Sequence, residues 1–256
     1  MEPSFITLTP ENLAQEHLCC IIRSKKPHPG VEAKRRWLAE RIPEGHVFRK
    51  LDVKGTVFIE YAPLETAWVP VVGDNYLYIY CLWVLGEFRG KGYARALMQS
   101  CIDDARAQGR SGICMLGAEK QKAWLSDQSF AQRFGFTAVD GAPNSYQLLA
   151  LSFDGTKPQF APGAKAQRID SPELTVYYSD QCPYIAQSVE LVRKTCAECG
   201  APVHLIRVDT LEKAKALPGV FNTWAMFMNG EFVTVNLPDA AAIRRLLAKR
   251  DAESGH

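Results

Sequence analysis

The sequence predicts a mixed α/β (α+β) protein with two successive domains, and three observations carry this prediction. An apolar strand, a basic glycine-rich loop and an amphipathic helix follow one another between residues 76 and 109. Residues 154–172 are rich in Pro, Gly, Lys and Ala and lack hydrophobic periodicity. Strand and helix patterns then resume. We therefore expect a larger domain over 1–153, a linker over 154–172 and a smaller domain over 173–256.

Hydrophobic patterns assign the other elements of the first domain. A strand opens it at residues 5–8, and Thr9, Pro10 and Asn12 are typical of a helix start. A second helix is expected over 31–41, because Pro43 and Gly45 follow it. The remaining pattern predicts strands at 47–51, 56–61, 76–84, 112–116, 136–139 and 146–151, with a helix at 123–133.

The loop that precedes the amphipathic helix has the chemistry of an anion site. A helix start leaves about four backbone N–H groups without intrahelical partners, and the helix dipole adds positive potential there. Gly90 and Gly92 remove Cβ atoms at two positions, and Ala94 keeps a third small. Arg89 and Lys91 add positive charge. The pattern predicts a phosphate-binding loop; the alternative is a glycine turn before a surface helix.

The loop Arg89-Gly90-Lys91-Gly92-Tyr93-Ala94 matches Arg/Gln-x-x-Gly-x-Gly/Ala, the pyrophosphate signature of the GNAT acetyltransferases, and residues 4–152 resemble that family. A Walker A loop would need Ser or Thr after Gly-Lys. The resemblance implies a GNAT acyl-CoA N-acyltransferase fold, acetyl-CoA as cosubstrate and no metal. It also implies a cofactor site at Leu82, Trp83, Val84, Arg89, Gly90, Lys91, Gly92, Tyr93 and Ala94.

The resemblance implies direct acetyl transfer to an amine, but the family's acid and base are not matched. Ala131 stands where the family has its usual acid tyrosine, and Tyr78 where some members carry a base glutamate. The catalytic candidates are therefore Glu60, Tyr78 and Tyr80. The alternative for the two tyrosines is an aromatic core face, and the alternative for Glu60 is a solvated hairpin residue.

The second domain shows the order β-α-β-α-β-β-α. We expect a strand at 174–178, a helix that ends near residue 199, and a second strand at 203–208. A short helix at 211–216, a hairpin over 225–234 with its turn at Asn229-Gly230, and a closing helix at 239–249 follow. With Cys182-Pro183-Tyr184 at its first helix start, the domain resembles thioredoxin-like proteins, glutaredoxins in particular. An acetyltransferase domain joined to such a module resembles the YoaP type of GNAT protein.

Cys182 is a further catalytic candidate, because a helix start stabilises a thiolate and lowers its pKa. Ile185 occupies the position of the resolving cysteine of dithiol proteins, and residues 221–225 lack the proline that many relatives of the thioredoxin fold carry there. Ordinary disulfide reductase activity is therefore not expected. A monothiol role for Cys182, substrate capture by it and a purely structural module remain open. Cys196 and Cys199 share one face of the predicted helix and are expected to pack inward rather than bind metal.

Composition narrows the partners. The 256 residues are 47% apolar with a net charge of +2, so nucleic acid is not expected, and clusters such as Lys34-Arg35-Arg36 are expected to be solvated. The N-terminus lacks a signal-peptide pattern, no apolar run approaches a membrane span, and eight cysteines suggest free thiols in the cytoplasm. The sequence leaves open whether the chain forms a homodimer.

These features predict an acetyl-CoA-dependent N-acetyltransferase that acts on an amine of a small molecule or peptide. The alternative is a catalytically silent acyl-CoA-binding domain coupled to a monothiol thioredoxin-like module, which the missing tyrosine at Ala131 favours. The sequence does not name the acceptor.

Overall fold

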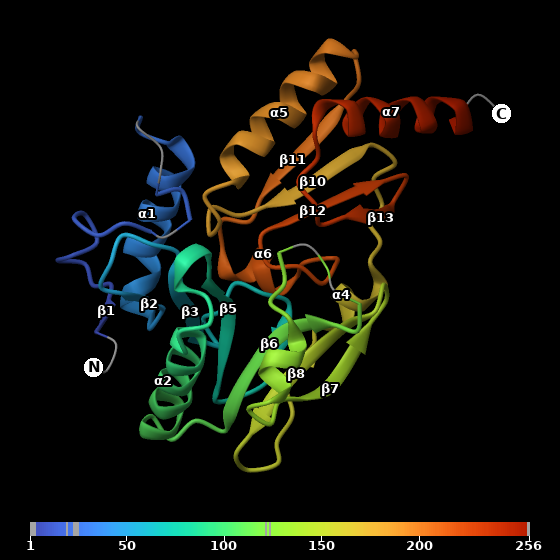
Figure 1. Cartoon of the computed structure of the whole chain (residues 1–256). Helices are drawn as coiled ribbons and strands as arrows, with labels where there is room; N and C mark the ends of the chain where they lie inside the picture. The colour runs from blue at the N-terminus through green and yellow to red at the C-terminus, as the bar shows by residue number, and fades with distance from the viewer. Residues whose placement is uncertain (1–3, 19, 23–25, 121, 123, 255–256) are drawn as a thin grey trace.

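The computed structural model of the chain describes residues 4–18, 20–22, 26–120, 122 and 124–254. The fold is mixed α/β, as expected, and its two larger sheets come from separate parts of the chain (Figure 1). The first sheet has seven strands in the order β1-β2-β3-β5-β6-β8-β7, and only the β5–β6 pair is parallel. The strands are β1 (Phe5–Thr7), β2 (Val47–Leu51), β3 (Val57–Pro63), β5 (Tyr76–Val84), β6 (Gly112–Ala118), β7 (Thr137–Ala142) and β8 (Tyr146–Ser152).

Helix α2 (Tyr93–Ala107) covers one face of this sheet through the apolar side chains that the sequence pattern had grouped together. Its buried residues are Leu97, Met98, Cys101, Ile102 and Ala105. Helix α1 (Pro29–Arg41) lies beside β2 and β3, as its side chains Trp37 and Leu38 pack with Phe48 and Phe58. Short 3-10 turns occur at Ile42–Glu44 and Gly86–Phe88.

The second sheet has four strands in the order β11-β10-β12-β13, and β10 is parallel to β11 but antiparallel to β12. Its strands are β10 (Leu174–Tyr178), β11 (Val203–Arg207), β12 (Trp224–Met228) and β13 (Glu231–Thr234). Helices α5 (Ile185–Glu198) and α7 (Ala240–Ser254) share one core with this sheet, and α6 (Leu211–Lys215) packs in another. We call residues 174–254 the C-terminal unit.

The predicted Asn-Gly hairpin is confirmed. Asn229 and Gly230 have φ angles of 54° and 76°, the left-handed conformation that a two-residue turn between β12 and β13 requires. No helix within the described residues is long and apolar enough to cross a membrane.

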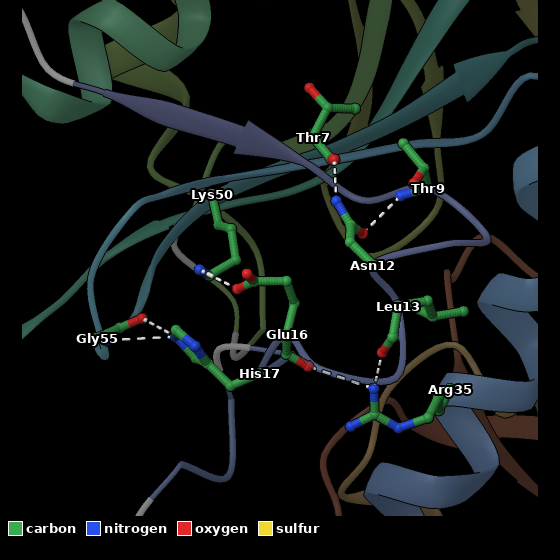
Figure 2. A network of polar contacts seen from close by, with 9 residues as sticks. All are labelled: Thr7, Thr9, Asn12, Leu13, Glu16, His17, Arg35, Lys50 and Gly55. Atoms are coloured by element: carbon green, nitrogen blue, oxygen red, sulfur yellow. Dashed lines mark hydrogen bonds and ion pairs between the residues drawn. The ribbon is translucent and has the colours of Figure 1, made fainter.

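The helix expected after Thr9 is wrong. The structure has turns over residues 10–15, because the Asn12 side chain satisfies local backbone groups instead (Figure 2). Its Oδ1 accepts from the N–H of Thr9 at 2.8 Å, and its Nδ2 donates to the carbonyl of Thr7 at 3.0 Å. Such side-chain bonds compete with a continuing helix.

The helix expected over 123–133 is shorter than predicted; residue 123 itself lies outside the described residues. Trp124 has a φ of 67°, which a right-handed helix excludes, and helix α3 runs only over Gln128–Gln132. The side chain of Asp127 caps it by accepting from the N–H of Ser129.

The stretch expected to be a linker has some structure of its own. Strand β9 (Gln159–Phe160) pairs with β4 (Val71–Val72), and helix α4 (Pro162–Ala166) follows. Phe160 and Ala164 are buried in a core cluster shared with the seven-stranded sheet. The division into domains at 153 and 173 stays a prediction.

Candidate active site

The glycine-rich loop ends where α2 begins, and its backbone is open to an anion. Gly92 is the N-cap of α2 with a φ of 81°, and no side chain of the described residues caps that turn. Gly90 has a φ of 74°, so both glycines adopt the left-handed conformation. A Cβ at either position would meet no protein atom within 4 Å, and Arg89 and Lys91 are exposed beside them. These residues fit a phosphate group.

Strands β5 and β6 separate toward the end of the sheet from which this loop leaves. They pair only over Tyr76–Ile79 and Gly112–Met115. Beyond that point β5 continues to Val84 against β3, while β6 continues to Ala118 against β8. A bulge marks the separation, because Tyr61 pairs with Ile79 and Glu60 with Cys81, which leaves Tyr80 without an opposite residue.

The predicted cofactor residues Leu82, Trp83 and Val84 lie on the separated part of β5. One backbone edge of this segment pairs with β3. On the other side, the hydroxyl of Ser126 donates to the carbonyl of Leu82 at 3.3 Å. Tyr93 and Ala94 are half-buried at the start of α2. The structure therefore brings the predicted loop and strand residues to one end of the seven-stranded sheet.

A cavity of about 190 Å³ lies between the seven-stranded sheet and the C-terminal unit. Cys81, Trp83 and Leu116 reach it from the separated strands β5 and β6. The C-terminal unit contributes Gln181, Cys182, Phe221 and Asn222, among others. We call this space the interface cavity. It adjoins the strand separation, because residues of both separated strands line it.

The segment before α1 forms another wall, which includes Cys20. Polar contacts fix this segment on the β2–β3 hairpin (Figure 2). Glu16 accepts from Nζ of Lys50 at 2.8 Å, and the His17 ring lies 3.1 Å from the carbonyl of Gly55. Cys20 is half-buried; its neighbour Cys19 lies outside the described residues.

Glu60 lies in a buried charged cluster and not in solvent. Its side chain is 0% exposed, and its two oxygens lie 2.7 Å from Nζ of Lys34 and 2.9 Å from Nε2 of His46. Burial by itself would raise the pKa of Glu60, but the Lys34 ammonium and the His46 hydrogen bond outweigh it and hold that pKa at about 2. Burial lowers the pKa of His46. The solvated reading of Glu60 is wrong.

Lys34 was expected on a solvated face, and this too is wrong, because the residue is 1% exposed. The ion pair with Glu60 overcomes the effect of burial and raises the Lys34 pKa. Lys34 also lines the interface cavity, so Glu60 stands behind it as the counter-charge.

Tyr78 and Tyr80 are buried on one face of β5, in a core cluster that contains several aromatic side chains. The Tyr78 hydroxyl donates to Oδ1 of Asn222 at 2.7 Å, and the Tyr80 hydroxyl accepts from the backbone N–H of Trp68 at 2.6 Å. Burial raises the pKa of both phenols. These contacts agree with the aromatic-core interpretation, and a catalytic role for either residue stays a prediction.

Cys182 lies just before α5 and lines the interface cavity, as the sequence placed it. The expected lowering of its pKa is not found. The cavity leaves part of the side chain accessible, but the surrounding protein buries the thiol and raises its pKa to about 11, which outweighs the hydrogen bond from the Tyr184 backbone. Cys196 is buried as predicted, whereas Cys199 is exposed. The described residues contain no group of three or more metal-ligating side chains.

Comparison with known proteins identifies the family. The family model described as "Acetyltransferase (GNAT) family" matches residues 12–136, and that described as "YoaP-like" matches residues 202–245. The chain is 35% identical over 245 residues to the "Uncharacterized N-acetyltransferase YoaP" of Bacillus subtilis (strain 168). The aligned residues cover 95% of this chain and 98% of that protein. This chain belongs to the YoaP-like GNAT acetyltransferases. It is therefore an acyltransferase.

Solved GNAT structures resemble part of this acetyltransferase. One is a GNAT acetyltransferase from Brucella melitensis in complex with acetyl-CoA, with 16% identity, a TM-score of 0.40, and 62% of this chain and 93% of that chain covered. Another is YncA of Salmonella typhimurium with its cofactor acetyl-CoA, with 14% identity, a TM-score of 0.44, and coverage of 61% and 97%.

Sequence reasoning missed Lys34, His46, Gln181 and Asn222 as residues at or behind the site. None of them stands in a motif. Lys34 carried one usable signal, because it follows Val31 by three residues and precedes Trp37 by three, which places it on the apolar side of α1.

Proposed function

We propose that this chain transfers the acetyl group of acetyl-CoA directly to the amine of a small molecule held in the interface cavity. One observation carries the proposal: the strand separation between β5 and β6 opens onto a cavity that the C-terminal unit closes. The loop Arg89–Ala94 lies in the same strand–loop–helix unit and would hold the pyrophosphate. The acceptor and the thioester would then meet at one place.

Binding would use backbone groups chiefly. The uncapped N–H groups at the start of α2 would donate to the pyrophosphate, and Arg89 and Lys91 would add charge. The backbone of Leu82 to Val84 would align the pantetheine as an added strand. In the reaction the amine nitrogen bonds to the acyl carbon, the C–S bond breaks, and a proton from the nitrogen ends on the sulfur. Orientation supplies much of the rate.

Glu60 fits a positioning role better than that of a base. Its carboxylate oxygens are already occupied by Lys34 and His46, and a pKa of about 2 makes it a weak proton acceptor. Its charge holds the Lys34 ammonium at the cavity wall.

We further propose that the C-terminal unit is a thioredoxin-like module used as a wall of the acceptor site. Support comes from its strand order β11-β10-β12-β13 and from the position of Cys182 before α5. Thiol chemistry is the less favoured alternative, because Ile185 replaces a resolving cysteine and the Cys182 pKa is raised.

Native mass spectrometry with titrated acetyl-CoA, followed by a screen of amine acceptors that reads released CoA thiol, tests the proposal. Gly92→Val should weaken acetyl-CoA binding by at least tenfold, because its side chain would enter the phosphate space. Gly109→Val is the matched control: Gly109 follows the other end of α2, has a φ of 63°, and a Cβ there also meets nothing within 4 Å. Equal effects of the two variants would refute the loop's role, and binding without turnover on any amine would refute the transferase proposal.

A further inference from the structure

We propose that the acceptor is a small, ring-bearing primary amine that binds in its neutral form, with an N–H that donates to Oε1 of Gln181 in the interface cavity. This inference rests on the proposed function and names the substrate class of the same site.

The size of the cavity favours a single ring. An engineered apolar cavity of about 150 Å³ binds benzene. The interface cavity measures about 190 Å³, which leaves room for a benzene-sized ring and a short alkyl arm. Its wall includes the side chains of Phe58, Trp83, Leu116, Leu125 and Phe221, so a ring would pack on apolar and aromatic surface.

The charges at the wall disfavour a polycation. Among the described residues that line the cavity, Lys34 carries the only formal charge, and no carboxylate lines it. Lys34 is neutralised by Glu60, which lies behind it. A polyamine or an aminoglycoside would therefore bring several positive charges into an apolar space without an anionic partner, at a large cost.

Gln181 is one of the polar residues in the wall of the cavity. The residue is 2% exposed and lines the cavity, and its Oε1 has no hydrogen-bond partner among the described residues. The other end of the amide is in contact with the wall, since Nε2 lies 4.0 Å from Sγ of Cys81 on β5. A buried acceptor that lacks a donor is costly, and an amine N–H would satisfy it.

The apolar environment also explains how a neutral, nucleophilic amine can form although Glu60, paired with Lys34 and His46, is not free to act as a base. Burial in an apolar space favours the neutral form of an amine, as it does for buried lysines. An ammonium ion would leave one proton in solvent on entry. The neutral amine then attacks the acyl carbon, and its remaining excess proton passes to the departing sulfur. Desolvation thereby replaces a dedicated base.

The test uses the full chain with 2-phenylethylamine, spermidine and an unmodified alanine tripeptide. Binding without acetyl-CoA is read from tryptophan fluorescence, since Trp83, Trp124 and Trp224 line the cavity. Acetyl transfer is read as released CoA thiol. We expect 2-phenylethylamine to bind and to be acetylated at least tenfold more efficiently than the other two.

Two matched pairs of variants locate the site. Val235→Trp should fill the cavity and abolish binding of 2-phenylethylamine, whereas Val233→Trp, on an exposed position outside the lining, should not. Gln181→Leu should raise the KM for this amine at least tenfold with an unchanged KM for acetyl-CoA. Gln187→Leu, at an exposed position on α5, should change neither.

Acetylation of spermidine or the tripeptide that Val235→Trp leaves intact would overturn the inference and leave the acetyltransferase proposal standing. Binding of 2-phenylethylamine that Val235→Trp abolishes, without acetyl transfer to any amine, would support the site and overturn the transferase proposal. Absence of 2-phenylethylamine binding would overturn the inference.

Discussion

Replacing Glu60 by Gln should destabilise the protein strongly, although the side chain keeps its shape. Glutamine has nearly the same shape as glutamate but carries no charge, so the substitution leaves the buried Lys34 ammonium without its counter-charge. His46 loses a charged acceptor in the same step. Lys34, His46 and Glu60 are 1%, 4% and 0% exposed, so solvent can compensate little.

Two routes give the magnitude. The Glu60 pKa falls from 4.5 to about 2, and at about 1.4 kcal/mol per tenfold change in acidity this corresponds to roughly 3 kcal/mol at neutral pH. Removing one partner of a buried ion pair typically costs about 3–5 kcal/mol. We therefore expect Glu60→Gln to lower the free energy of unfolding by about 3–5 kcal/mol at pH 7.

Urea unfolding followed by tryptophan fluorescence measures this loss, since the Trp37 ring lies 4.8 Å from the His46 ring and reports on the cluster. The double variant Lys34→Met with Glu60→Gln leaves no unpaired charge in this cluster and should regain most of the stability. Because the folded Glu60 pKa is depressed, its contribution is present above pH 4.5 and is lost as the pH falls toward 2. A loss below 1 kcal/mol, or a double variant no more stable than the single one, would refute the reasoning.

Two further predictions concern the contact between the two parts of the chain. A Cβ on Gly30 would lie 1.8 Å from the carbonyl oxygen of Pro183, so Gly30→Ala must push α1 and the C-terminal unit apart by more than 1 Å. We expect steady-state kinetics to show a fall of about 10- to 100-fold in kcat/KM for the amine, with the affinity for acetyl-CoA unchanged. Cys182, with its pKa raised from 9.0 to about 11, should hold about 100-fold less thiolate at pH 7.5 than a cysteine of pKa 9 and should react more slowly with iodoacetamide than that cysteine does. A Cys182 that reacts faster than the cysteine of pKa 9 would restore the thiol alternative.

The central parts of the fold could be predicted from the sequence because their patterns are local. The strand Tyr76–Val84 was predicted with the bounds that the structure shows, since a continuous apolar run stands between polar turns. The errors lie where one side chain or one backbone angle decides. Asn12 satisfies a turn instead of a helix, and Trp124 adopts a left-handed conformation that hydrophobic spacing does not encode.

The candidate site divides in the same way. The loop Arg89–Ala94 is a contiguous motif, so its position at a helix start followed from the sequence. The interface cavity joins residues far apart in the chain, such as Cys20, Cys81 and Gln181, and no local pattern predicts their meeting. The sequence likewise placed Cys182 before a helix but could not show how deeply its thiol is buried, which decides its pKa.

If the C-terminal unit is a thioredoxin-like module, as we propose, its contacts with the seven-stranded sheet would account for a loss of redox chemistry. Where β5 and β6 separate, apolar side chains such as Leu116 would face water if nothing covered them. The C-terminal unit covers this surface with specific bonds: Asn222 accepts from Tyr78 at 2.7 Å, and Nζ of Lys215 donates to the carbonyl of Leu64 at 2.7 Å. A disulfide-exchange surface must stay open to a protein partner, whereas this one is used for docking. In the proposed arrangement Cys182 would contribute to the wall of the acceptor site, and a resolving cysteine at Ile185 would add nothing.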